Sequence, residues 1–280
     1  MKGLLSAILA MALLFSVSCK NSDRDLDNST GSSVSAWTSM NHFHNIMREV
    51  HRVAQVDSVL NGVNPSDALL PDNCMDSLVR TPNLGPFPID VEIFYSDFKS
   101  CEGQRNRSGK INATFNGSYS DLGTVIDVTL TDYMVDNVSI SGDIKMTVIQ
   151  SVIDSLIFDV EITNGSLTDF DKPGKNQSYF DANIVFNNST GRKTIPTNDD
   201  NFVMTGEGNG IAENGVIYSY IIENEMVLLP DCEYEQFGSF RLSAPNTQDR
   251  ICNVNEGDGC DNIFQIAIPP ANGNQVVEIK

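Results

Sequence analysis

Residues 89–95 read Ile-Asp-Val-Glu-Ile-Phe-Tyr, and residues 111–116 read Ile-Asn-Ala-Thr-Phe-Asn. In both stretches apolar side chains largely alternate with polar ones. Successive side chains of a β-strand point to opposite faces of the sheet, so this period of two predicts strands with one buried face. The stretch 125–132, Val-Ile-Asp-Val-Thr-Leu-Thr-Asp, continues the pattern.

Similar runs recur along the chain, near residues 143–149, 153–163, 179–187, 201–205, 215–223, 236–243, 250–254, 261–268 and 275–279. Dipeptides that favour tight turns separate many of them: Asn116-Gly117, Asn164-Gly165, Asn214-Gly215, Asp258-Gly259 and Asn272-Gly273. Short connections favour antiparallel neighbours, and no β-α-β spacing is present. We therefore expect a mostly β fold: a long antiparallel meander of roughly ten to twelve strands, which must curl or become sandwich-like.

A different period precedes the strands. Between residues 35 and 61 apolar side chains recur every three or four positions, as at Trp37, Met40 and Phe43, which predicts one amphipathic helix ending before Gly62. Prolines make residues 62–87 an irregular connection. We expect residues 35–280 to form a single domain in which this helix packs on the apolar face of the sheet 88–280.

All three histidines of the chain lie in the predicted helix, as His42, His44 and His51. His44 and His51 are seven residues apart and share a face. A metal site would prefer spacings of three or four with a carboxylate on the same face, and Glu49 does not meet that condition. We interpret the histidines as flanking the helix–sheet contact, and we expect no metal and no cofactor.

The hairpin near the C-terminal end of the chain makes one disulfide testable. If strand 236–243 turns and returns at 249–254, the numbers of paired residues sum to about 491, so Cys232 faces residue 259, next to Cys260. This register predicts a Cys232–Cys260 disulfide and places Cys252 opposite Ser239.

Two further expectations concern the remaining cysteines. Cys252 has no cysteine opposite it, so it is the candidate free thiol. Cys74 and Cys101 form the remaining disulfide candidate by exclusion. The spacing of these cysteines fits no zinc pattern, and no histidine lies near them.

The first 18 residues have the build of a secretory signal peptide: Lys2, about a dozen apolar or small residues, then small residues up to Ser18. The apolar run is shorter than the roughly 20 residues of a membrane span. Cys19 follows directly and resembles the acylated cysteine of bacterial lipoproteins, whose two acyl chains hold a protein on a membrane. Residues 19–34 are expected to form a disordered tether, and their start resembles the export tether of Bacteroidota lipoproteins.

Turn glycines and cysteines recur through the strand region: residues 109–119, 123–124, 132–137 and 141–142, with 89–101, Arg105 and Arg107 ahead of them and Cys232, 238–240 and 257–262 near the end. This set, over about residues 86–280, resembles an uncharacterised family of β-rich lipoproteins of Bacteroidota. The resemblance implies a β fold and an envelope location, and it implies no activity. Cys252 is an addition to the family pattern.

The chain carries a formal net charge of −19. The negative electrostatic field of such a chain argues against nucleic-acid binding and against attraction to anionic lipid surfaces. The one partner that the sequence indicates is a membrane, through lipidated Cys19. We expect an exported protein, held at the outer membrane and facing either the periplasm or the cell surface.

Catalytic residues are not predicted. The acid pairs Asp199-Asp200 and Asp169 with Asp171 could serve hydrolysis only across a cleft, and no histidine lies among the strands to act as a base. The expected function is a non-enzymatic binding or structural module at the cell envelope. Two alternatives stay open: a carrier of a lipid or other apolar ligand between the helix and a curved sheet, and a glycan-acting hydrolase.

Three triplets resemble the short acceptor that exported Bacteroidota proteins use for O-glycosylation: Asp57-Ser58-Val59, Asp76-Ser77-Leu78 and Asp154-Ser155-Leu156. The resemblance makes Ser58, Ser77 and Ser155 candidate sugar acceptors, provided that their hydroxyls are accessible.

Overall fold

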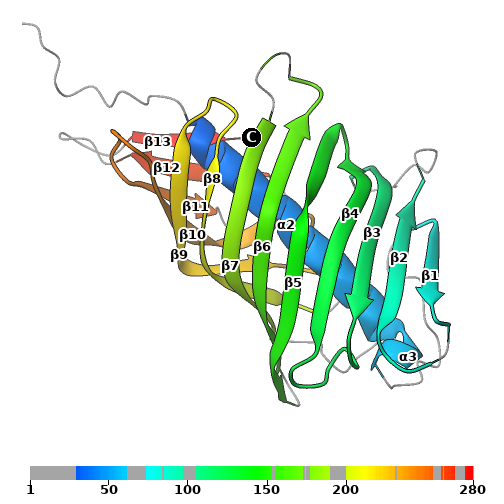
Figure 1. Ribbon diagram of the computed structural model, residues 1–280. Helices are drawn as coiled ribbons and strands as arrows, with labels where there is room; N and C mark the ends of the chain where they lie inside the picture. Colours follow the sequence, from blue (N-terminus) through cyan, green and yellow to red (C-terminus); the bar gives the residue numbers. More distant parts are fainter. Residues whose placement is uncertain are drawn as a thin grey trace, which may run out of the picture.

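The computed structural model describes residues 30–61, 74–83, 85–96, 105–152, 155–172, 174, 177–189, 200–230, 232–254, 260, 262–268 and 275–279. Within these ranges the chain forms one antiparallel sheet of 13 strands that curls around a long helix (Figure 1). The strands are β1 (Ser77–Thr81), β2 (Ile89–Tyr95), β3 (Arg107–Phe115), β4 (Val125–Val135), β5 (Val138–Val152), β6 (Ser155–Asp169), β7 (Gln177–Asn188), β8 (Phe202–Ile211), β9 (Ile217–Leu228), β10 (Glu235–Ser243), β11 (Arg250–Val254), β12 (Phe264–Ile268) and β13 (Gln275–Ile279).

Every strand pairs with its neighbours in sequence, so the order across the sheet is simply β1 to β13. The predicted antiparallel meander is confirmed, as a single curled sheet, with one strand more than the predicted range. The inner side chains of β2 show why the alternation predicted it: Ile89, Val91 and Ile93 are buried, whereas Asp90 is exposed. Each such buried aliphatic side chain stabilises the fold by about 1.5–3 kcal/mol.

The additional strand, β1, corrects the prediction that residues 62–87 are irregular throughout. It pairs with β2 over its whole length, from Ser77 opposite Phe94 to Thr81 opposite Asp90. Its side chains are exposed or only half-buried, because it is an edge strand. A strand of five residues with no fully buried position has little hydrophobic alternation. The sequence next to Pro82 therefore did not indicate a strand.

In the part of the chain that the structure describes, two helices precede the sheet, α2 (Gly31–Val56) and α3 (Ser58–Asn61). They are separated at Asp57, whose carboxylate accepts hydrogen bonds from the backbone N–H groups of Val59 and Leu60 at 2.9 and 3.1 Å. This is the geometry of a helix N-cap, so the predicted single helix 35–61 is in fact broken near its end.

The start of α2 also differs from the prediction. Residues 31–34 are helical, so they belong to the domain and not to the predicted tether. Ser32 and Ser33 are buried, and Arg250 of β11 donates to the Ser32 hydroxyl at 3.3 Å. Small hydroxyl side chains indicate a tether when the chain is taken alone, but here they let the helix lie close to the sheet.

Most residues of α2 are buried, on every side of the helix, because the sheet curls around it (Figure 1). Phe43 stacks on Phe180 of β7, with ring centroids 5.5 Å apart. A Cβ atom added at Gly165 would lie 2.2 Å from the Phe180 carbonyl oxygen and 3.0 Å from the Phe43 ring. Gly165 lies at a β-bulge between β6 and β7, and such bulges bend a sheet. None of the helices that the structure describes combines the length and the apolar character that a membrane span needs.

Candidate functional site

The side of α2 that faces the connection between β9 and β10 is polar. His42, Asn45, Glu49 and Arg52 follow one another at steps of three or four, with Arg48 beside them, and all five are buried. A buried charge is costly unless it is paired and hydrogen-bonded, so each of these groups must have a partner.

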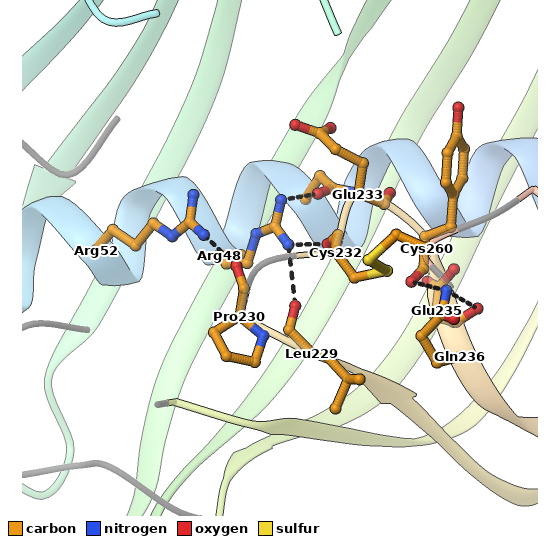
Figure 2. The surroundings of a disulfide bond; sticks show 11 residues. Arg48, Arg52, Leu229, Pro230, Cys232, Glu233, Glu235, Gln236 and Cys260 are labelled. Atoms are coloured by element: carbon orange, nitrogen blue, oxygen red, sulfur yellow. Dashed lines mark hydrogen bonds between the residues drawn. A yellow bond between two sulfur atoms is a disulfide. The ribbon is translucent and has the colours of Figure 1, made fainter. Parts of the chain in front are cut away.

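The partners of Asn45, Arg48 and Arg52 come from residues 229–230 and 232–235, which lie against the helix and which we call the closing segment (Figure 2). The Arg48 guanidinium donates to the backbone carbonyls of Leu229, at 3.3 Å, and Cys232. Arg52 donates to the carbonyl of Pro230. These three carbonyls lie outside the strands and so have no ladder partner. Each accepts from a charged guanidinium instead, and charged donors make stronger hydrogen bonds than neutral ones.

Three further contacts hold the same segment. The Asn45 side-chain amide donates to the carbonyl of Glu233 at 2.8 Å. The Glu233 carboxylate in turn accepts from Arg107 of β3 at 2.7 Å. The Arg105 guanidinium lies over the Tyr234 ring, 5.6 Å from its centroid. The closing segment therefore joins the helix to the start of β3, on the far side of the curl from β10.

Glu49 is the central anion of this cluster. Its carboxylate lies 3.1 Å from Arg52 and 3.9 Å from both Arg48 and Arg107. Burial raises the pKa of Glu49, but the three guanidinium groups outweigh burial and lower that pKa below its ordinary value. Burial and the neighbouring charge of Arg52 lower the pKa of Arg48 to about 10, so Arg48 keeps its charge at neutral pH. Burial opposes the charge of Arg107 as well, but Glu49 and other groups raise its pKa.

A disulfide fixes the closing segment to the loop after β11. Cys232 and Cys260 are bonded, with their Cα atoms 5.3 Å apart, as the hairpin register predicts (Figure 2). The register itself is one residue different from the prediction: β10 and β11 pair with a sum of 492, so Cys252 lies opposite Phe240 and not opposite Ser239.

The other cysteines have separate roles. Cys252 is a free, buried thiol, and burial raises its pKa to about 12. This thiol is therefore protonated and poorly nucleophilic at neutral pH. Cys74 is disulfide-bonded, and its predicted partner Cys101 lies outside the described residues.

The three histidines do not converge. His44 Nδ1 lies 2.5 Å from the Glu235 carboxylate. His42 lies 3.5 Å from Arg105, and burial together with Arg105 and Arg107 lowers the pKa of His42 well below its ordinary value. Within the described ranges, no group of three or more histidine, cysteine, aspartate or glutamate side chains is placed to hold a metal ion.

His51 has the partners most similar to those of a catalytic base. Its ring nitrogens lie 2.6 Å from the Tyr119 hydroxyl and 3.0 Å from the Asp200 carboxylate, which also accepts from Asn188 at 3.2 Å. Phe202 packs edge-on against the imidazole, with ring centroids 4.9 Å apart. The His51 and Asp200 side chains are fully buried, so this group satisfies polar atoms inside the fold and offers no surface to a substrate.

The acid pairs that could have served hydrolysis do not form a cleft together. Asp200 is the buried partner of His51, and Asp199 lies outside the described residues. Asp169 pairs with Lys172 at 3.2 Å, and Asp171 accepts from the Asn137 amide. Hydrolysis by paired carboxylates needs both to face one open site.

The described residues line open hollows on the outer face of the sheet. One of about 410 Å³ lies over β7 to β10 and is lined by outward side chains such as Glu207, Ile221 and Arg241. Smaller hollows of about 260 and 320 Å³ lie over β4 to β6 and over the adjoining ends of β2 to β4. These are shallow surfaces of a twisted sheet and not enclosed ligand chambers.

The candidate sugar acceptors differ in accessibility. Ser58 and Ser77 are exposed, on α3 and on edge strand β1. Ser155 is half-buried, and its hydroxyl donates to Asn187 at 3.0 Å.

Sequence reasoning missed the cluster around Glu49. Arg48, Glu49 and Arg52 look like the solvent-exposed side of an amphipathic helix when only one apolar side is expected to be covered. The sequence did contain one indication of a polar cluster: Arg48 and Arg52 are four residues apart, on the side of the helix that also carries Asn45. Comparisons with protein-family models, curated proteins and solved structures found no match to this chain.

Proposed function

We propose that this chain is an exported lipoprotein, held on the outer membrane by acylated Cys19, whose β domain is a non-enzymatic binding or structural module. The signal-like residues 1–18 and the small residues before Cys19 support the anchor. The motifs between residues 86 and 280 support membership of the β-rich Bacteroidota lipoprotein family.

The observation that carries the non-enzymatic assignment is the burial of the polar side chains of helix α2. Its three histidines, its arginines and Glu49 are all buried, and their partners belong to the protein itself. A general base or nucleophile must reach a substrate, and these groups face the interior. Function is therefore assigned to the outer surface of the sheet.

The carrier alternative needs space that the helix occupies. Trp37 lies against Phe264 of β12, with ring centroids 5.2 Å apart, and Phe43 lies against Phe180 of β7. An apolar ligand could enter between helix and sheet only after α2 moved and the closing segment lost the bonds to Arg48 and Arg52. Extraction of the purified protein with organic solvent tests this alternative, since a stoichiometric lipid would favour it over our proposal.

The anchor is tested by comparing the full chain with a Cys19→Ser variant in the native host. We expect the unaltered chain in the membrane fraction, with the intact mass of a chain that begins at acylated Cys19. The variant should be released from the membrane. A membrane-free chain with unmodified Cys19, or one that retains residues 1–18, would refute the proposal.

The same mass spectrum examines the sugar acceptors, because any O-linked glycan on Ser58, Ser77 or Ser155 adds to the mass of the bare lipidated chain. A non-penetrating protease added to intact cells then determines the orientation. Loss of the protein, while a periplasmic control survives, would place the domain outside the cell.

A further inference from the structure

Three large apolar side chains lie next to one another on the outer face of the sheet. Tyr179 of β7 pairs with Ile211 of β8, and Ile211 pairs with Ile217 of β9, so they form one row across three strands. Their exposed fractions are 46%, 38% and 61%. An isolated exposed apolar residue needs no explanation, but a contiguous row marks a surface that contacts another apolar phase.

The row lies at the end of the domain where the helix starts. The β8–β9 turn follows Ile211 directly, and there the backbone N–H of Glu213 donates to the hydroxyl of Ser35, in the second turn of α2, at 3.4 Å. Figure 1 shows the β8–β9 hairpin beside the N-terminal end of α2, drawn in dark blue. The chain therefore enters the domain close to the apolar row.

The length of chain ahead of the domain restricts where an anchor can lie. Thr30, the first residue that the structure describes, follows Cys19 by eleven residues. Even fully extended, eleven residues span at most about 40 Å. Helix α2, with 26 residues, is itself about 39 Å long at 1.5 Å per residue. A membrane that holds Cys19 is thus always within reach of the end of the domain that carries the row.

The charged groups around the row have polar partners within the protein. Lys172, in the neighbouring β6–β7 turn, lies 2.8 Å from Glu213 and 3.2 Å from Asp169. Asp181, two residues after Tyr179, accepts from the backbone N–H of Asn164 at 2.8 Å. Paired groups are easier to bring to a lipid interface than free ones. The chain's net charge of −19 makes a zwitterionic surface more favourable than an anionic one.

We propose that Tyr179, Ile211 and Ile217 rest in the interfacial region of the zwitterionic membrane that holds acylated Cys19. This orients the domain with the start of α2 and the β8–β9 turn toward the lipid and with α3 away from it. Tyrosine suits this position because its ring is apolar and its hydroxyl is polar. The inference rests on the proposed lipid anchor.

The test places an environment-sensitive dye on the anchored protein. In the unaltered chain Cys252 is buried, and Cys74, Cys232 and Cys260 are in disulfides, so labelling of the unaltered chain serves as the blank for an added surface cysteine. Ile217→Cys places the dye in the row. The matched control, Leu122→Cys, places it in the exposed β3–β4 turn at the other end of the domain, where Tyr119 bonds to Leu60 of α3.

Both proteins are incorporated through their acyl chains into phosphatidylcholine vesicles. We expect a blue-shifted emission and several-fold weaker iodide quenching at position 217, with neither change at position 122. Replacing Tyr179 and Ile211 by serine in the Ile217→Cys protein should restore quenching, and near-ultraviolet circular dichroism shows that the fold is kept.

Equal quenching at positions 217 and 122 would overturn the inference. Iodide quenching at position 217 that is just as weak without vesicles would also overturn it, because that result assigns the row to contact between copies of the chain. Failure of the anchor is distinguished by mass: a chain without acyl groups refutes the proposed function, whereas an acylated chain with a water-exposed dye refutes only the docking surface.

Discussion

Replacing Arg48 by methionine should strongly destabilise the domain, because it removes one of the buried donors that hold the closing segment. The Arg48 guanidinium bonds to the carbonyls of Leu229 and Cys232 and to the side-chain oxygen of Asn45. A buried acceptor left without its donor costs about 1–3 kcal/mol. Three acceptors lose their donor here, but some of them can bind water or shift to another donor. The total cost should therefore be about 3–5 kcal/mol, which is typical for removing one member of a buried ion pair. We expect a decrease of that size in the free energy of unfolding.

The matched control is Arg241→Met. Arg241 also pairs with a glutamate, Glu223, but the side chain of Arg241 is 46% exposed. An exposed pair contributes at most about 1 kcal/mol. The assay is urea unfolding with disulfides intact, followed by the fluorescence of Trp37, the sole tryptophan, which is buried beside β12. If Arg48→Met costs no more than Arg241→Met at an unchanged m-value, the reasoning about the closing segment is wrong.

The remaining predictions concern the disulfide, one histidine and one glycine. Replacing Cys232 and Cys260 together by serine should lower the free energy of unfolding by about 3–4 kcal/mol, because the bond closes a loop with a sequence separation of 28 residues; a loss below 1 kcal/mol in urea unfolding would contradict this. The pKa of His42 is lower in the folded than in the unfolded protein, so its contribution is present above pH 6.5 and is lost as the pH falls below that value, with a slope of at most about 1.4 kcal/mol per pH unit. Thermal unfolding of the His42→Gln variant between pH 7 and 5 should therefore show a weaker pH dependence than the unaltered chain, and an equal slope would refute the assignment. Gly165→Ala should cost about 1–3 kcal/mol, since the new Cβ meets the Phe180 carbonyl, and an unchanged melting temperature would refute that contact.

Alternation of side chains was enough to predict most of the sheet. In β2 and β7 buried positions alternate with exposed or half-buried ones, because each strand has one face toward the helix and one toward water. The order of the strands followed from short connections alone. The Cys232–Cys260 bond followed from the same register, although a shift of one residue changed the residue opposite Cys252 from Ser239 to Phe240.

The environment of the helix could not be predicted in the same way. Periodicity indicates that Phe43 and Met47 are buried, but it does not reveal how far a sheet curls around the opposite side. Arg48 and Glu49 are therefore compatible with either water or a buried cluster until the closing segment is in place. The carbonyls that Arg48 binds, those of Leu229 and Cys232, lie more than 180 residues away in the sequence, and local patterns contain no information on such distances.

The sequential order of the strands also bears on how the chain reaches its fold. Each strand can pair with the one before it as soon as both exist, so the sheet grows by local steps, which are kinetically favourable. The helix has the opposite requirement: Trp37 bonds to Asn262 and Ser32 to Arg250, both near the other end of the chain. During synthesis the helix precedes the strands, yet its wrapping is completed last. Arg48, Arg52 and Trp37 lack these native partners until the segment from Leu229 to Asn262 has been made.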